Sequence, residues 1–122
     1  PNLYIKRTRR RRNKHIDLKR VAAEIAATRD STIVYVPTKD ETDEIANILQ
    51  EKLLASDIRV CSYHAGKKPR ERDKAQEDFL SGRATVIVAT IAFGMGIDKP
   101  DVRRVVHYGP PRTIENYFQE IG

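Results

Sequence analysis

With 122 residues, the chain has the size of one domain built on a single hydrophobic core. Its 39% hydrophobic and 33% charged residues are typical of a globular protein, and no apolar run is long enough to span a membrane. The single cysteine, Cys61, excludes an internal disulfide and favours a reducing, intracellular compartment. No apolar segment of a signal peptide follows the basic N-terminus.

The positive charge is concentrated near the N-terminus. The formal net charge is +6, and seven of the 23 basic residues lie between Lys6 and Lys14. Without those seven, 16 basic residues stand against 17 acidic ones, so the rest of the chain is close to neutral. Such a block favours contact with phosphates or a nuclear-import signal, although a solvated tail without function is the simpler alternative. The centre of the block is Arg9, Arg10, Arg11 and Arg12.

After this block the chain alternates between helical and strand patterns. Apolar residues at helical spacing predict helices over residues 16–28, 38–56 and 69–81. Short β-branched runs predict strands over residues 32–36, 59–63, 85–89 and 102–108. Residues 1–5 are expected to be extended, and Thr113 to cap a last helix. Alternation with short connections predicts the α/β class, with a mainly parallel sheet covered by helices on both faces.

Polar side chains follow three of the predicted strands. Thr38, His64 and Thr90 each stand at the carboxyl end of one strand. Because the carboxyl ends of parallel strands meet at one edge of a sheet, these residues are expected to form a continuous rim that faces a ligand. Thr38, with Glu41 three residues later, matches a capping box, and the free amides at a helix N-terminus can bind a phosphate.

These features also have simpler interpretations. Thr38 can cap its helix without binding a ligand, and a single histidine such as His64 is more often a structural hydrogen-bonding residue than a catalyst. Gly94 and Gly96, which follow Thr90, can belong to an ordinary glycine-rich connection. The residues by themselves leave these alternatives open.

The chain lacks the sequence elements that grip a nucleoside triphosphate. It contains no Gly-x-x-x-x-Gly-Lys-Ser/Thr segment, and Gly94-Met95-Gly96 lacks the third glycine of a dinucleotide-binding pattern. No Asp-Glu pair follows an apolar strand, where it could hold Mg²⁺. The chain alone is therefore expected not to hydrolyse ATP.

The segment from Ala89 to Arg103 reads ATIAFGMGIDKPDVR and resembles motif V of the RecQ family of superfamily 2 DNA helicases almost letter for letter. Four further segments resemble that family: PNL at residues 1–3, the segment that begins at Thr38 and is similar to motif IV, YHAG at residues 63–66, and YFQEIG at residues 117–122, which is similar to the opening of motif VI. Lys67 stands where the family usually has an apolar residue. Residues 107–109 and 119–122 are most similar to the Werner-type branch.

The resemblance implies a RecA-like, three-layer αβα fold with a mainly parallel sheet, as in the second motor domain of such helicases. Residues 1–15 would form a linker and basic arm. Residues 16–122 would form the motor domain, ending inside motif VI before the family's arginine finger. A first RecA-like domain of the same parent chain would hold most of the ATP and Mg²⁺.

The resemblance also implies roles for single residues. Gly96, Asp98 and Gln119 would approach the nucleotide. The residues that would face DNA are Thr38, Lys39, His64, Gly66 and Thr90, together with Arg9, Arg10, Arg11 and Arg12. The parent protein would couple ATP hydrolysis to 3′-5′ unwinding of DNA at single strands and duplex junctions. It would act in DNA repair and recombination, in the nucleus if the source is eukaryotic, and it would have no membrane partner.

Other functions remain as alternatives. A stand-alone nucleic-acid-binding module would show salt-sensitive binding, carried mostly by residues 6–14. A small doubly wound enzyme would need a general acid–base constellation, which the sequence does not offer. An RNA helicase of the same superfamily is close to the first interpretation, and the string Phe93-Gly94-Met95-Gly96 favours the RecQ family over it.

Overall fold

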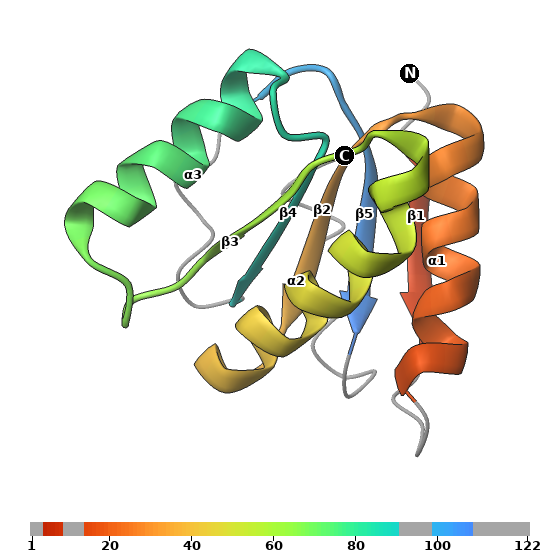
Figure 1. The fold of residues 1–122 in the computed structure, drawn as a ribbon, viewed down its shortest axis with the longest axis horizontal. Helices are drawn as coiled ribbons and strands as arrows, with labels where there is room; N and C mark the ends of the chain where they lie inside the picture. The colour runs from red at the N-terminus through yellow and green to blue at the C-terminus, as the bar shows by residue number, and fades with distance from the viewer. Residues whose placement is uncertain (1–3, 9–13, 91–98, 109–122) are drawn as a thin grey trace.

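The computed structural model describes residues 4–8, 14–90 and 99–108, and the strands in these ranges form one five-stranded sheet. The strand order is β1-β5-β2-β4-β3, and every pairing is parallel (Figure 1). The strands are β1 (Tyr4–Thr8), β2 (Ser31–Val36), β3 (Val60–Tyr63), β4 (Val86–Thr90) and β5 (Val102–Tyr108). The predicted parallel sheet is confirmed, and the ends of β2 to β5 lie within one residue of the predicted ones.

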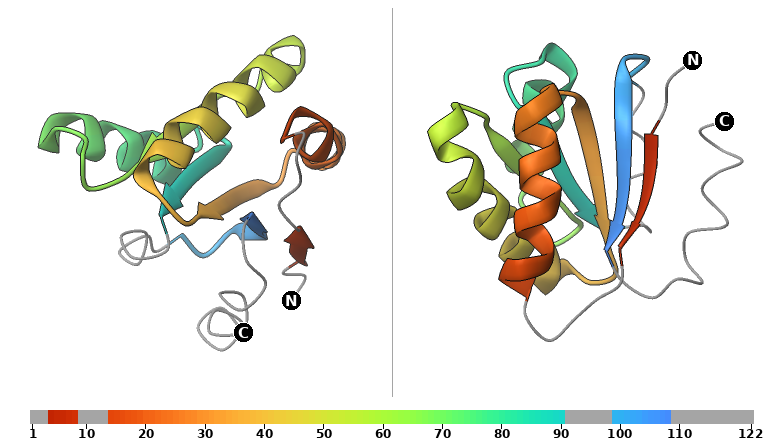
Figure 2. Two further views of the ribbon diagram at one scale, coloured as in Figure 1. Left: turned by 90° about the horizontal axis from the view of Figure 1, so that it is seen from below. Right: turned by 90° about the vertical axis from the view of Figure 1, so that its right-hand side faces the viewer.

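Helices cover both faces of this sheet. They are α1 (Lys14–Thr28), α2 (Lys39–Leu53) and α3 (Pro69–Ser81), and a short 3₁₀ helix, η1 (Leu54–Ser56), follows α2. The helices α1 and α2 lie together on one side of the strands (Figure 2), and α3 packs on the other side. The fold therefore has three layers, as the alternating sequence pattern predicts.

The larger core lies between the sheet and the pair α1–α2. Leu18, Val21 and Ile25 recur at helical spacing in α1 and are at most 1% exposed. Ile45 and Leu49 do the same in α2, and alternate residues of β2, β4 and β5 complete the cluster. Full burial of such a side chain contributes about 1.5–3 kcal/mol each. The helical spacing in the sequence is thus the pattern of a buried face.

A second core on the opposite face holds α3 in place. Phe79 is fully buried there against Ile33 and Tyr35 of β2 and Ile87 of β4. Since β2 contributes to both cores, it is apolar on both sides, which is usual for a central strand of a parallel sheet. This explains why residues 33–36 form a continuous apolar run instead of an alternating one.

Two helix ends are set by left-handed residues. The predicted helix over residues 38–56 is α-helical only to Leu53; its last turn is the 3₁₀ helix, closed by Asp57 at φ 58°. The helix α3 ends at Gly82, whose φ of 88° suits glycine and whose N–H donates to the Phe79 carbonyl. The predicted C′ glycine is confirmed.

The N-terminal segment contributes more to the sheet than its sequence suggests. The strand β1 is parallel to β5, from the pair Tyr4 and Arg104 to the pair Thr8 and Tyr108. Part of the basic block, Lys6 and Arg7, therefore lies in a strand, and α1 begins at Lys14 rather than at residue 16. Edge strands tolerate charged residues, which discourage pairing with other chains. The division of the chain after residue 15 stays a prediction.

Several predicted features lie outside the described residues, namely the arginines at positions 9–12 and the last helix capped by Thr113. None of the helices in the described part of the chain has the length and apolar character that crossing a bilayer requires.

Candidate functional site

The three predicted rim residues lie at one edge of the sheet. The strands β2, β4 and β3 are neighbours in that order, and Val36 pairs with Thr90 while Tyr63 pairs with Ala89. The residues that follow β2 and β3, Thr38 and His64, therefore stand at the same carboxyl edge as Thr90, which ends β4. This rim is at the lower end of the strands in Figure 1, where the arrowheads point.

Thr38 caps α2, as its sequence predicts. Its backbone is extended (φ −128°, ψ 158°), and its Oγ1 accepts the Glu41 N–H at 3.3 Å. The same hydroxyl donates to Glu41 Oε1 at 3.1 Å, so the Glu41 carboxylate reaches the Thr38 side chain. The hydroxyl of Thr38 is thus engaged within the protein. The negative charges of Asp40 and Glu41 in the first turn offset the positive end of the helix dipole. The positive charge at this end of α2 therefore comes from the side chain of Lys39.

His64 is held by hydrogen bonds on both ring nitrogens. The residue is 7% exposed; its Nδ1 accepts the Gly66 N–H at 3.0 Å, and its Nε2 lies 3.0 Å from Asp43 Oδ2. A backbone N–H can only donate, so Nδ1 is the acceptor and the proton of the neutral ring is on Nε2, which donates to Asp43. These contacts favour the structural interpretation of His64 over a catalytic one.

Asp43 of α2 joins this histidine to two further side chains. Asp43 Oδ1 accepts from Ser62 Oγ at 3.1 Å and lies 3.5 Å from Lys67 Nζ. Desolvation raises the pKa of Asp43, but the hydrogen bonds from His64 and Ser62 and the charge of Lys67 outweigh it and hold that pKa below its ordinary value. The sequence did not identify Asp43 and Ser62 as site residues, because their spacing along the chain does not indicate that α2 and β3 meet here.

Gly66 lies where a larger residue would not fit easily. A Cβ on Gly66 would be 3.2 Å from His64 Cε1 and Nδ1 and 3.4 Å from Lys39 Cδ. The imidazole is fixed on both sides, so it cannot move away to make room. Lys39, His64 and Gly66, three of the predicted DNA-facing residues, are therefore brought together by the fold.

Thr90, at the end of β4, lies between Thr38 and His64 along the rim. It is 7% exposed. The connection that follows it, residues 91–98, lies outside the described residues; it contains Gly96 and Asp98. Gln119 lies outside the described residues as well. The chain is described again from Lys99, whose ammonium group forms an ion pair with Asp101 and lies 5.6 Å from the centre of the Phe79 ring. The hydrogen bond from Lys99 lowers the pKa of Asp101. The return of this connection into β5 is thus anchored on α3.

The sequence of this chain is similar to those of known helicases. Residues 14–122 match the model of the helicase conserved C-terminal domain. The chain belongs to this family. It is 50% identical over 91 residues to the ATP-dependent helicase wrn-1 of Caenorhabditis elegans, covering 75% of the chain. It is 42% identical over 92 residues to the ATP-dependent DNA helicase RecQ of Haemophilus influenzae, again covering 75% of the chain. The RecQ-type resemblance is confirmed.

The helicase domain spans only 8% of the length of wrn-1 and 14% of that of RecQ. Its fold is similar to the solved structure of Mss116p DEAD-box helicase domain 2 bound to an RNA duplex, with a TM-score of 0.75 and 19% sequence identity. That match covers the whole chain and 48% of the solved one. The predicted RecA-like fold is thereby confirmed.

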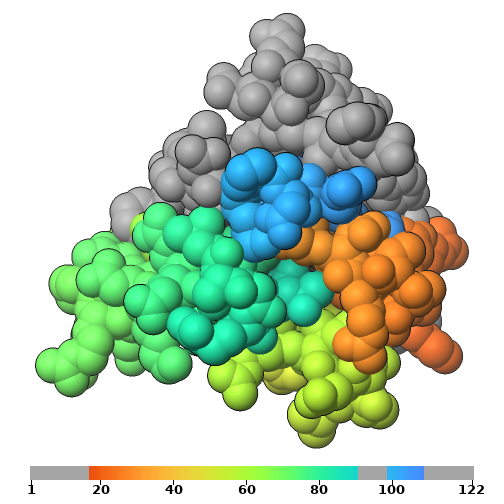
Figure 3. All heavy atoms as spheres, turned by 90° about the horizontal axis from the view of Figure 1, so that it is seen from above, coloured from red at the N-terminus to blue at the C-terminus, as the bar shows by residue number. Residues whose placement is uncertain are grey.

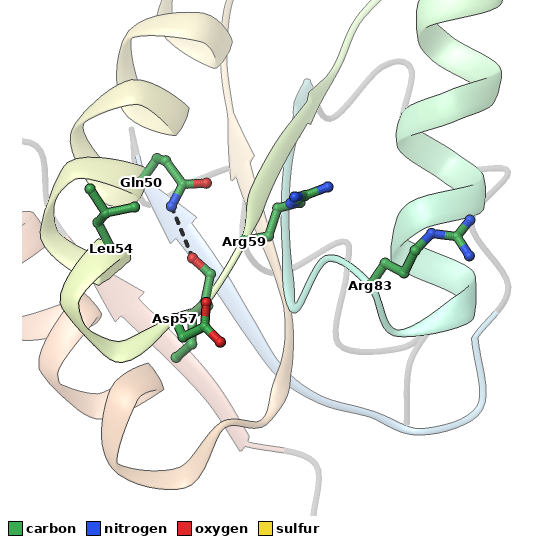
Figure 4. A pocket seen from close by; sticks show the side chains of 6 residues that line it. Gln50, Leu54, Asp57, Arg59 and Arg83 are labelled. Atoms are coloured by element: carbon green, nitrogen blue, oxygen red, sulfur yellow. Dashed lines mark hydrogen bonds between the residues drawn. The ribbon is translucent and has the colours of Figure 1, made fainter.

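A groove of about 450 Å³ opens at the other end of the helicase domain, where the strands begin (Figure 3). It is lined by Gln50, Leu54, Asp57, Ile58, Arg59 and Arg83 (Figure 4). The Gln50 side chain on α2 is held in place at this groove by two hydrogen bonds. Its Nε2 donates to the Ile58 carbonyl at 2.9 Å, and its Oε1 accepts the Val60 N–H at 2.8 Å. The amide thus pairs with the backbone at the start of edge strand β3. None of the predicted site residues lines this groove.

Proposed function

We propose that this helicase domain is the second motor domain of an ATP-dependent RecQ-like 3′-5′ DNA helicase, and that its rim holds one DNA strand. The supporting observation is the gathering of four polar or basic residues and one glycine at the carboxyl ends of three neighbouring strands: Thr38, Lys39, His64, Thr90 and Gly66. Most protein–DNA hydrogen bonds go to phosphate and sugar, which suits a rim of backbone amides and lysines.

The contacts at the rim divide the work among these residues. Because the Thr38 hydroxyl is engaged with Glu41, Thr38 orients the first turn of α2. His64 orients its loop through Gly66 and Asp43. Lys39 and Lys67 are then the cations that offset the charge of a phosphate.

ATP and Mg²⁺ would be held mainly by a first RecA-like domain of the same parent chain. Gly96 and Asp98 would reach the nucleotide from the connection that leaves the rim at Thr90, and Gln119 from motif VI. One connection would then respond to both DNA and nucleotide, which is a physical route for coupling two sites. Duplex junctions as substrates, roles in repair and recombination, and a nuclear location in a eukaryote belong to this proposal.

A stand-alone nucleic-acid-binding module is the second candidate, and the basic block at residues 6–14 favours it. This alternative is tested by changing the arginines at positions 9–12 to glutamine. Deletion through Lys14 would be a poor test, because it would also remove the edge strand β1.

The deciding experiment measures ATP turnover of the intact parent protein and of the 122-residue chain, with and without single-stranded DNA or RNA. We expect DNA to stimulate the parent strongly and the 122-residue chain to show no turnover, since it lacks a triphosphate-gripping loop. Stimulation by RNA alone would favour an RNA helicase. A parent without any stimulation would contradict the motor function, and a loss of binding on substitution of the four arginines would then support the binding module.

A further inference from the structure

The Asp43 carboxylate is the point at which α2, β3 and the loop after β3 meet. It contacts Ser62 on β3, His64 at the start of the loop and Lys67 further along the loop, at 3.0–3.5 Å. The Asp43 side chain is 50% exposed, whereas those of Lys67 and His64 are 22% and 9% exposed. A half-exposed carboxylate therefore orders two side chains that are more buried than itself.

Two hydrogen bonds within the loop extend these contacts. His64 receives the Gly66 N–H on Nδ1, and the Lys67 N–H donates to the His64 carbonyl at 3.2 Å. A Cβ on Gly66 would lie 3.4 Å from Lys39 Cδ, so the loop is close to that side chain at the start of α2. Asp43 thus fixes the imidazole, the imidazole fixes the loop, and the loop lies close to the N-terminal turn of the helix that carries Asp43.

We propose that Asp43 is a positioning residue for nucleic-acid binding: it holds residues 64–67 against the N-terminus of α2, so that Lys39 and Lys67 present their charges to one strand at a fixed separation. The inference rests on the proposed DNA-binding function of the rim. Asp43 itself would repel a phosphate. The negative charge of Asp43 by itself would thus weaken nucleic-acid binding, whereas its positioning of the two lysines would strengthen it.

Because these two effects are opposite, Asp40 is a matched control. Asp40 and Asp43 lie within the first two turns of the same helix, and both are acidic residues close to the rim. If only charge mattered, replacing either by alanine would strengthen DNA binding, because a repulsive charge is lost. A positioning role predicts that Asp43→Ala weakens binding while Asp40→Ala does not.

The test uses the intact protein, and its probe is fluorescently labelled oligo(dT) of about 15 nucleotides, followed by anisotropy at several salt concentrations. We expect Asp43→Ala to weaken binding about three- to tenfold. Asp43→Asn keeps an oxygen acceptor for His64 but loses the ion pair with Lys67, so its affinity should lie between those of Asp43→Ala and the wild type. Lys39→Ala should weaken binding and reduce the salt slope by about 0.7.

A second readout reports the histidine directly. Nitrogen-15 NMR of the neutral imidazole, assigned with a His64→Gln variant, should show the proton on Nε2 in the wild type. In Asp43→Ala the released ring should lose its hydrogen bond from the Gly66 N–H and show a mixture of tautomers. A change confined to overall stability would not move this signal, so it separates positioning from a purely structural role.

The outcomes separate the two proposals. If Lys39→Ala weakens binding but Asp43→Ala behaves like Asp40→Ala, or the tautomer is unchanged, the positioning role is wrong while the DNA-binding rim stands. If the wild-type protein does not bind the oligonucleotide, both proposals are wrong. If Asp43→Ala fails to fold, Asp43→Asn decides: an affinity equal to or above that of the wild type would contradict the inference.

Discussion

The buried His107 should make the stability of this domain depend on pH. It lies in β5 with 1% of its surface exposed, and its ring stacks on Tyr35 with 5.5 Å between ring centroids. Burial lowers the pKa of His107 from 6.5 to about 4, since the charged imidazolium loses its hydration inside the protein. The folded state therefore keeps a neutral histidine where the unfolded chain would already bind a proton.

The sign of the effect follows from that difference. As pH falls below 6.5 the unfolded chain takes up a proton at His107 and the folded chain does not, until pH reaches about 4. The free energy of unfolding should therefore fall across this window and level off below it, as far as His107 is concerned. A pKa difference of roughly 2.5 corresponds to a loss of about 3 kcal/mol, a large part of the stability of a small domain.

The assay is urea unfolding of the 122-residue chain, followed by circular dichroism between pH 4 and 8, for the wild type and His107→Phe. Phenylalanine keeps an aromatic ring beside Tyr35 and cannot take up a proton. Asp43, Asp78 and Asp101, whose pKa values are lowered, lose their stabilising contribution as pH falls further, but both proteins share them. The wild type should lose more stability than the variant between pH 6.5 and 4, and parallel curves would refute the reasoning.

Two further predictions concern the buried Arg104 and the partly buried Cys61. Arg104 on β5 contacts Glu24 at 2.9 Å and Asp30 at 3.5 Å. Arg104→Met should therefore lower the free energy of unfolding by about 2–3 kcal/mol, because these carboxylates lose their ion pairs with the guanidinium, and adding Glu24→Gln should restore part of that loss. Equal stability of the wild type and Arg104→Met in urea titrations would show that these ion pairs contribute nothing. Burial raises the pKa of the Cys61 thiol to about 12, so a disulfide reagent should react far more slowly with the native chain than with the urea-unfolded one, and equal rates would contradict that burial.

The local features of the site were predictable because they depend on neighbours in sequence. Thr38 and Glu41 are three residues apart, and that spacing alone predicts the helix start that the structure contains. Gly82 likewise marks the left-handed end of α3. The shared edge of Thr38, His64 and Thr90 follows from strand–helix alternation, since parallel strands must end on the same side.

The contacts around Asp43 could not be predicted in this way. Asp43 is 19 residues from Ser62 and 21 from His64, and they meet only because α2 packs beside β3. The same holds for Gly66 against Lys39. These pairings depend on how helices pack on a twisted sheet, and no period in the sequence encodes that packing.

The sequence by itself determined the three helices, the strands β2 to β5, the parallel sheet, the rim and the family, because each depends on local propensity, hydrophobic period or a long motif. Only the tertiary structure decided the strand order, the place of Tyr4–Thr8 as an edge strand beside β5, and the burial of His107 and Arg104. Basic residues such as Lys6 and Arg7 give no local signal for a strand; they are in one because the exposed edge of β5 offers hydrogen-bonding partners. Long-range pairing of this kind is a property of the whole fold.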